Sequence, residues 1–202
     1  MNQRVPAIIA PSVRRVLERL EQEDSEERQL SLPRSERARQ IAPTTGRFLF
    51  ALAAGRVECK VLEIGGSRGY SAIWLASAVA LFGGRVVSLE SDRRKIDAWH
   101  TNLAEAGLVE WAELIEGDAF VTLPKLEERF NLCFLDAEKE DYERLFTLAR
   151  QKLAPGAVVV ADNVLSHAKD LTAYSQTRQS DPTLVSVTVP LDNGLELSVL
   201  SS

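Results

Sequence analysis

Short apolar runs alternate with amphipathic stretches from residue 60 onward. The runs "KVLEI", "RVVSLE", "AELIEG", "NLCFLD" and "AVVVAD" are separated by segments such as "YSAIWLASAVALF" and "DYERLFTLARQKLAPG", whose apolar residues recur at helical spacing. This alternation is typical of βαβ units around a parallel sheet. It predicts an α/β fold with a doubly wound sheet and helices on both faces.

The C-terminal part departs from this alternation. A helical segment, "LSHAKDLTAYSQTRQS", is followed by two strands with alternating polarity in "TLVSVTVPLDNGLELSVLSS". They are joined at Asp192, Asn193 and Gly194, which have the composition of a hairpin turn. We therefore expect seven strands, mostly parallel, with an antiparallel hairpin at the C-terminal end.

We expect a single domain that spans residues 1–202. Within it, residues 1–40 are predicted to form a helical N-terminal extension. Val13, Leu17 and Leu20 recur at helical spacing, and Pro33 breaks the pattern. A second helix is expected in "APTTGRFLFALAAG", which begins near Pro43 and ends near Gly55.

Composition narrows the class of protein. A chain of 202 residues with 45% hydrophobic and 26% charged residues is typical of one globular domain. The net charge of -5 disfavours nucleic acid as a partner, and no apolar window is long enough for a membrane span. Cys59 and Cys133 are isolated, which favours reduced core thiols and a cytoplasmic location.

In a doubly wound sheet, ligands bind beyond the carboxyl ends of the strands. The first predicted strand ends in "VLEIGGSRGYS", where Glu63 is followed by a glycine-rich turn. The turn differs from G-x-G-x-x-G, so a dinucleotide pyrophosphate, and with it a nicotinamide dehydrogenase, fits poorly. Glu90 ends the second strand and can accept hydrogen bonds from ribose hydroxyls, while Asp118 follows the third and can also serve as a helix cap. Together these strand ends indicate a nucleoside site without a phosphate group.

With these motifs in order, the chain resembles the class I S-adenosylmethionine-dependent methyltransferases, in particular the cation-dependent O-methyltransferases that include catechol and caffeoyl-CoA O-methyltransferases. The resemblance runs from about Ile41 to the C-terminus through "VLEIGGSRGYSAIWLA", "VVSLE", "EGDAF", "FLDAEKEDY" and "VVVADNVL". It implies a Rossmann-like fold, S-adenosylmethionine as methyl donor and a homodimer. It also implies a set of cofactor-binding residues: Ile41, Glu63, Gly65, Ser67, Ser71, Glu90, Asp118, Ala119 and Asp136.

A cation site is expected where the fourth and fifth strands end. Asp136 ends one, and Asp162 with Asn163 ends the other. Adjacent strands lie about 4.8 Å apart, so the three side chains can converge on one hard cation, such as Mg²⁺, Mn²⁺ or Ca²⁺. Asp162 and Asn163 alone would equally suit a helix cap. The resemblance implies that Lys139, at the mouth of this site, is the general base and acts with Asp136.

The sequence thus predicts an enzyme that moves a methyl group to a hydroxyl of a small catechol-like or vicinal-diol substrate. Two alternatives stay open: a wobble hydroxyuridine tRNA O-methyltransferase of the same family, and a protein that binds the cofactor without catalysis. His167 follows the proposed cation turn and could face the substrate, but a lone histidine at the start of a helix is more often structural.

Overall fold

The computed structural model describes residues 8–33 and 36–201, and part of the expected N-terminal extension, residues 1–7 and 34–35, therefore lies outside the described residues. Seven strands form one sheet in the order β3-β2-β1-β4-β5-β7-β6. The parallel strands are β1 (Cys59–Ile64), β2 (Gly84–Glu90), β3 (Ala112–Glu116), β4 (Phe130–Leu135) and β5 (Leu153–Ala161). The hairpin of β6 (Leu184–Val189) and β7 (Leu195–Leu200) pairs antiparallel to β5. The predicted fold class is confirmed.

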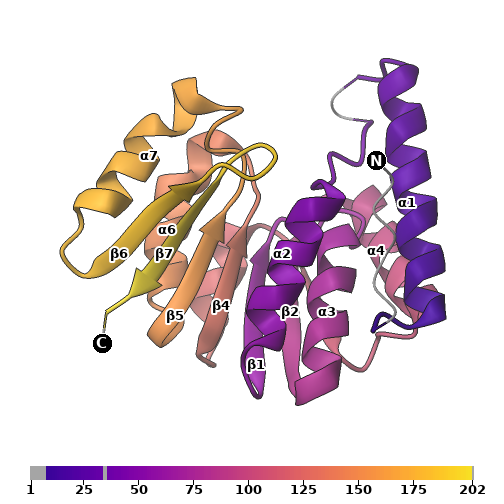
Figure 1. Ribbon diagram of the computed structural model, residues 1–202, viewed down its shortest axis with the longest axis horizontal. Helices are drawn as coiled ribbons and strands as arrows, with labels where there is room; N and C mark the ends of the chain where they lie inside the picture. The colour runs from indigo at the N-terminus through magenta and orange to yellow at the C-terminus, as the bar shows by residue number, and fades with distance from the viewer. Residues whose placement is uncertain (1–7, 34–35, 202) are drawn as a thin grey trace.

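Helices cover both faces of the sheet, each over its own apolar cluster. One face carries α1 (Pro11–Gln29), α2 (Pro43–Ala54), α3 (Tyr70–Phe82) and α4 (Arg93–Ala106), and the other carries α5 (Ala119–Thr122), α6 (Tyr142–Arg150) and α7 (Ala168–Ser180). Short 3-10 turns occupy Leu123–Lys125 and Lys139–Asp141. Figure 1 shows the first group beside β1 and β2 and the hairpin at the opposite end of the sheet.

The N-terminal helix α1 lies against α4. Its Val13, Leu17 and Leu20 are buried, as their spacing predicts. Ser12 donates to the carbonyl of Ala106 at 3.1 Å, which fixes the start of the helix. The expected helical character of residues 1–40 therefore holds for α1, whereas the described residues after Gln29 form turns and irregular backbone that lead to α2.

Cys59 and Cys133 are buried and unpaired, in agreement with their interpretation as core thiols. Burial raises the pKa of Cys133 to about 12, so its thiol is protonated and unreactive near neutral pH. No helix among the described residues combines the length and apolar character that crossing a bilayer requires.

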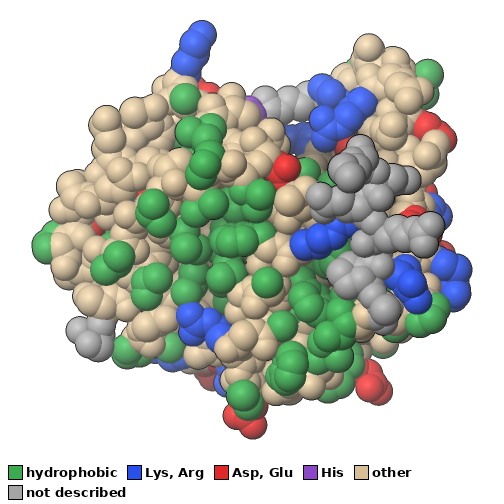
Figure 2. Space-filling view, viewed as in Figure 1, with side chains coloured by type: hydrophobic (Ala, Val, Ile, Leu, Met, Phe, Trp, Pro, Cys, Tyr) green, Lys and Arg blue, Asp and Glu red, His purple; other side chains and the backbone are tan. Residues whose placement is uncertain are grey.

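The helices leave part of the sheet uncovered. In Figure 1, the strands β5, β7 and β6 face the viewer with no helix in front of them. Val185 is 73% exposed and Val187 53% exposed on β6. Figure 2 shows a continuous group of hydrophobic side chains over the same strands.

Candidate functional site

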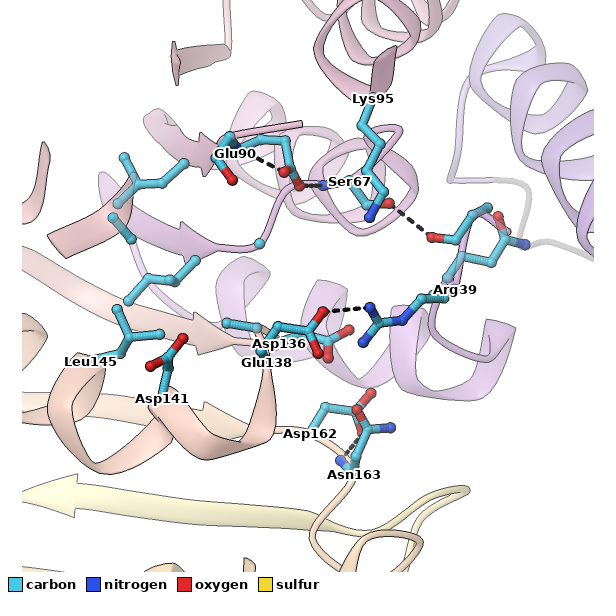
Figure 3. A pocket seen from close by; sticks show the side chains of 18 of the residues that line it. Arg39, Ser67, Glu90, Lys95, Asp136, Glu138, Asp141, Leu145, Asp162 and Asn163 are labelled. Carbon is cyan, nitrogen blue, oxygen red and sulfur yellow. Dashed lines mark hydrogen bonds and ion pairs between the residues drawn. The ribbon is translucent and has the colours of Figure 1, made fainter. Parts of the chain in front are cut away.

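A cavity of about 500 Å³ opens where the parallel strands end. Its volume is in the range of small-molecule and cofactor sites. Eight of the sequence-predicted site residues line it: Gly65, Ser67, Glu90, Asp118, Ala119, Asp136, Asp162 and Asn163. Figure 3 shows how Ser67 and Glu90 lie on one side of the cavity and Asp136, Asp162 and Asn163 on the other. The predicted cofactor end and the predicted cation end therefore belong to one cavity.

The turn after β1 requires glycine at its first position. Gly65 has a φ of +97°, and a Cβ built there would lie 2.1 Å from the carbonyl oxygen of Asp136. Any side chain would push the turn away from the end of β4. Because Gly65 has none, the backbone of this turn passes directly beside Asp136.

Glu90 holds this turn in place. Its Oε2 accepts from the amide of Ser67 at 2.8 Å, and its Oε1 accepts from the amides of Ser91 at 2.8 Å and Asp92 at 2.9 Å. A carboxylate offers about four lone-pair sites, so the backbone uses three of them. The predicted ribose contact therefore has one acceptor site left on this carboxylate.

Asp118 serves as a cap and also faces the cavity. Its Oδ1 accepts from the amide of Phe120 at 2.8 Å at the start of α5. Ala119 lies beside it in the cavity wall. The two interpretations of Asp118 are thus compatible, because the capping bond occupies only part of the carboxylate.

Glu63 lies behind the turn and is fully buried. Its Oε2 accepts from the hydroxyl of Ser88, and among the described residues its Oε1 has no partner within hydrogen-bonding geometry. Burial raises the pKa of Glu63 to about 7, while the hydroxyls of Ser71 and Ser88 oppose that shift. The side chain lies beneath the turn and is absent from the cavity lining, so its expected role in cofactor binding stays a prediction.

The proposed cation ligands lie at the ends of two paired strands. Leu135 of β4 is aligned with Ala161 of β5, which places Asp136 and Asp162 next to each other. Asp162 is 2% exposed, and burial, followed by the charge of Asp136, raises its pKa to about 7. Two carboxylates and the Asn163 amide are the oxygen donors that suit a hard divalent cation, which would stabilise both negative charges. Within the described ranges, no cluster of three or more His, Cys, Asp and Glu side chains could hold a metal ion, so the proposed set depends on the amide.

Lys139 is located differently from the expectation. Its side chain is 6% exposed and lies behind Asp136, away from the cavity mouth. The Nζ atom donates to Asp136 Oδ1 at 3.0 Å, the Ala137 carbonyl at 3.0 Å and the Tyr142 hydroxyl at 2.9 Å. These three acceptors match the three donors of an ammonium group. In this geometry Lys139 holds Asp136 in position, and sequence spacing alone could not show that the side chain turns inward.

Tyr142 completes this support. Its hydroxyl lies 3.2 Å from the Leu135 carbonyl and 3.0 Å from the Asp162 carbonyl, at the ends of β4 and β5. Burial, together with the charges of Asp136 and Asp162, raises the pKa of Tyr142 well above its usual value. The hydroxyl is therefore a neutral hydrogen-bonding group that ties the two strand ends together.

Two predicted cofactor residues, Ile41 and Ser71, are buried and do not line the cavity.

Two residues that line the cavity, Arg39 and Asn193, were not predicted from the sequence. Arg39 Nη1 pairs with Glu138 Oε1 at 2.6 Å, close to Asp136 in Figure 3. Asn193 belongs to the hairpin connection, and its carbonyl accepts from the amides of Leu165 and Ser166. The polar composition of that connection could have indicated a cavity residue at Asn193, but the same composition is equally typical of a turn. His167 also borders the cavity.

Comparison with known proteins agrees with this geometry. A family model described as a methyltransferase domain matches residues 62–164, just over half of the chain. The chain belongs to this methyltransferase family. The matched region runs from β1 to the proposed cation turn, and the fold is similar to that of solved S-adenosylmethionine-dependent O-methyltransferases.

Two curated relatives of this methyltransferase are catechol O-methyltransferases. The one from Niastella koreensis is 36% identical over 139 residues, which cover 67% of this chain and 62% of that protein. The one from Mycobacterium tuberculosis is 38% identical over 126 residues, or 62% of this chain and 57% of that protein. The matches thus span about six-tenths of each relative. Among solved structures, the O-methyltransferase TomG from Streptomyces achromogenes in complex with S-adenosylmethionine is 28% identical, with a TM-score of 0.78 over 91% of this chain and 89% of that one.

Proposed function

We propose that this methyltransferase transfers a methyl group from S-adenosylmethionine to a hydroxyl of a small catechol-like or vicinal-diol substrate and requires a divalent cation. One observation carries the proposal: the glycine turn with Glu90 and the Asp136, Asp162 and Asn163 set open into the same cavity. A donor and an acceptor hydroxyl bound there would lie side by side, and positioning of this kind accounts for much of the rate of a methyl transfer.

Each part of the cavity has a proposed task. Gly65, Ser67 and Glu90 hold the nucleoside of the donor, and Asp118 with Ala119 borders its base. S-adenosylmethionine supplies an electrophilic methyl group on its sulfonium. Asp136, Asp162 and Asn163 hold the cation, which when bound would position two neighbouring substrate oxygens and lower the pKa of the hydroxyl it binds. Lys139 donates to Asp136 and holds that carboxylate in position, and its amine stays the proposed general base.

A methyl-transfer assay over a panel of vicinal diols and matched single phenols tests the proposal. We expect product only with vicinal diols, loss of activity with EDTA, and recovery on addition of Mg²⁺ or Mn²⁺. Full activity in EDTA would contradict the cation site. A transcript that contains wobble hydroxyuridine serves as a further arm, and methylation of that RNA alone would favour the tRNA alternative.

Three further proposals concern the whole chain. We propose that the described helices and sheet act as one methyltransferase domain, because the same sheet carries every part of the cavity. A homodimer is supported by the exposed valines on β6, which are characteristic of a protein contact. A cytoplasmic location stays a prediction, supported by the two unpaired cysteines.

A further inference from the structure

One wall of the cavity is formed by a short segment outside the sheet. We call residues 36–40 the strap. It connects the α1 side of the molecule to α2 and contributes Arg37, Ala38, Arg39 and Gln40 to the cavity lining. The strap therefore lies against the glycine turn, at the edge of the space that the methyl donor would occupy.

The carboxylate of Glu27 on α1 joins the strap to that turn. Its Oε2 accepts from the amide of Ala38 at 2.7 Å, and its Oε1 accepts from Arg68 Nη1 at 2.6 Å. The side chain of Glu27 is only 13% exposed, so water weakens these charge-assisted bonds little. Arg68 also donates to the Glu36 carbonyl at 3.1 Å. One acidic group thus holds two walls of the cavity at a fixed separation.

The strap has further attachments on the cavity side. Ser67 donates through its hydroxyl to the Ala38 carbonyl at 2.8 Å, and Arg39 reaches the turn after β4 through Glu138. Arg39 has a φ of 54°, in the left-handed region, which a non-glycine residue keeps only when its surroundings hold it there. These contacts hold the strap in one defined position, with Glu27 at its outer edge.

We propose that Glu27 is a positioning residue for the methyl donor: by holding the strap closed against the glycine turn, it slows cofactor dissociation. This inference rests on the proposed function, since it takes S-adenosylmethionine as the occupant of the cavity. Glu27 does not line the cavity itself and acts through Ala38 and Arg68. Displacement of the strap by a departing cofactor would break the bond from Ala38 to Glu27.

Glu27→Gln tests the proposal, and Glu26→Gln is its matched control. An amide has one acceptor oxygen, so the substituted side chain can satisfy only one of the two donors and turns its NH₂ group toward the other. Glu26 lies one residue away on the same helix, is exposed, and accepts from Gln22 on its own helix. We expect Glu27→Gln to raise the dissociation rate of S-adenosylhomocysteine, measured by stopped flow, by about tenfold. KM for S-adenosylmethionine should rise by a similar factor, with a much smaller change in kcat, and Glu26→Gln should match the wild type.

Hydrogen exchange of the peptide that contains residues 36–40 gives a second measurement. If Glu27 holds the strap, the amides of this peptide should exchange faster in Glu27→Gln than in the wild type or in Glu26→Gln, even when the melting temperatures of the three proteins agree. A variant that melts earlier but keeps the wild-type dissociation rate and KM would overturn the inference and leave Glu27 with a purely structural role. If the wild-type protein itself fails to bind S-adenosylhomocysteine, the proposed function fails instead, so the two failures are distinguishable.

Discussion

At the scale of single residues, the site depends on charges that the fold places out of water. Glu63, Asp162 and Lys139 are each less than a tenth exposed, although charged side chains are rarely buried without a partner. Lys139 has three partners, whereas one oxygen of Glu63 has none among the described residues. These two groups give different predictions, one for catalysis and one for stability.

Lys139→Met removes the amine and keeps a long unbranched side chain in the buried position. If the amine accepts the substrate proton, kcat should fall by about 10²- to 10⁴-fold, with partial recovery at higher pH as hydroxide replaces it. Calorimetry should show nearly unchanged affinity for S-adenosylhomocysteine, because Lys139 does not line the cavity. Lys169→Met, at an exposed lysine of α7, is the control. A Lys139→Met enzyme with near wild-type kcat at every pH would leave the lysine only its contact with Asp136.

Glu63→Gln should change how stability depends on pH. The folded pKa is about 7, and the pKa in the unfolded chain is about 4.3. Because the folded value is raised, the folded protein binds more protons between these two values, and the free energy of unfolding falls as pH rises through this window. The loss attributable to Glu63 is on the order of 4 kcal/mol by about pH 8.

Urea unfolding at about pH 5 and about pH 8 measures this effect as a difference between proteins. Glu63→Gln should lose less stability across the window than the wild type, because glutamine does not titrate. Glu113→Gln, at an exposed position on β3, should behave as the wild type does. Equal losses in all three proteins would show that Glu63 keeps an ordinary pKa in the folded state.

At the scale of elements, the carboxyl ends of the strands place the site, and the turns after them require particular backbone conformations. Gly65 combines a left-handed φ with close contact to the Asp136 carbonyl, whereas Gly107 ends α4 with a φ of +74° and nothing within 4 Å of its Cβ position. Alanine substitutions at the two glycines therefore separate the cost of a left-handed backbone conformation from the cost of steric overlap.

Gly107→Ala should cost about 1 to 2 kcal/mol in the free energy of unfolding, which is the cost of a left-handed conformation alone. Gly65→Ala should cost more and should also abolish measurable binding of S-adenosylhomocysteine, because the new Cβ displaces the turn from Asp136. Urea unfolding and calorimetry on both variants check this pair. Equal destabilisation with cofactor binding intact in both would show that the turn can relax around the added carbon.

The elements differ in how far the sequence could predict them. The bounds of α2 follow from Pro43 and Gly55. The strand ends follow from apolar runs that stop at an acid, namely Glu90, Asp136 and Asp162. The sheet and the eight predicted residues that line the cavity could therefore be found from the sequence. The strap could not, because its position depends on contacts of Ala38 with Glu27 and Ser67, which belong to two other elements of the fold. The direction of the Lys139 side chain depends on its hydrogen bonds to Ala137 and Tyr142, which are near it in sequence but which no apolar periodicity indicates.

At the scale of the whole molecule, the two faces of the sheet are unequal near its C-terminal edge. The back of the hairpin packs on α7, where Gln179 bonds to Thr188 and Glu196. On the front, Val187 is aligned with Leu197, which is in turn aligned with Val160 of β5. Val160 and Leu197 belong to the apolar cluster of the face that carries α2 and α3, and in Figure 1 no helix lies in front of β5, β7 and β6. A second copy of the chain would remove Val185 and Val187, which are both more than half exposed, from water, at about 25 cal/mol for each Å² of apolar surface.

Val187→Glu tests the proposed homodimer. A glutamate at this position, where the valine is 53% exposed, would cost little in a monomer but would place a charge inside the dimer contact. We expect light scattering to give the mass of two chains for the wild type and of one chain for Val187→Glu, with similar melting behaviour. Val109→Glu is the control, because Val109 is 58% exposed in the α4–β3 connection, well away from the hairpin, and should leave the mass unchanged. A wild-type protein with the mass of one chain at micromolar concentration would contradict the homodimer. A dimeric Val187→Glu would instead show that another surface forms the contact, since a buried, unpaired carboxylate on β6 could not be accommodated in it.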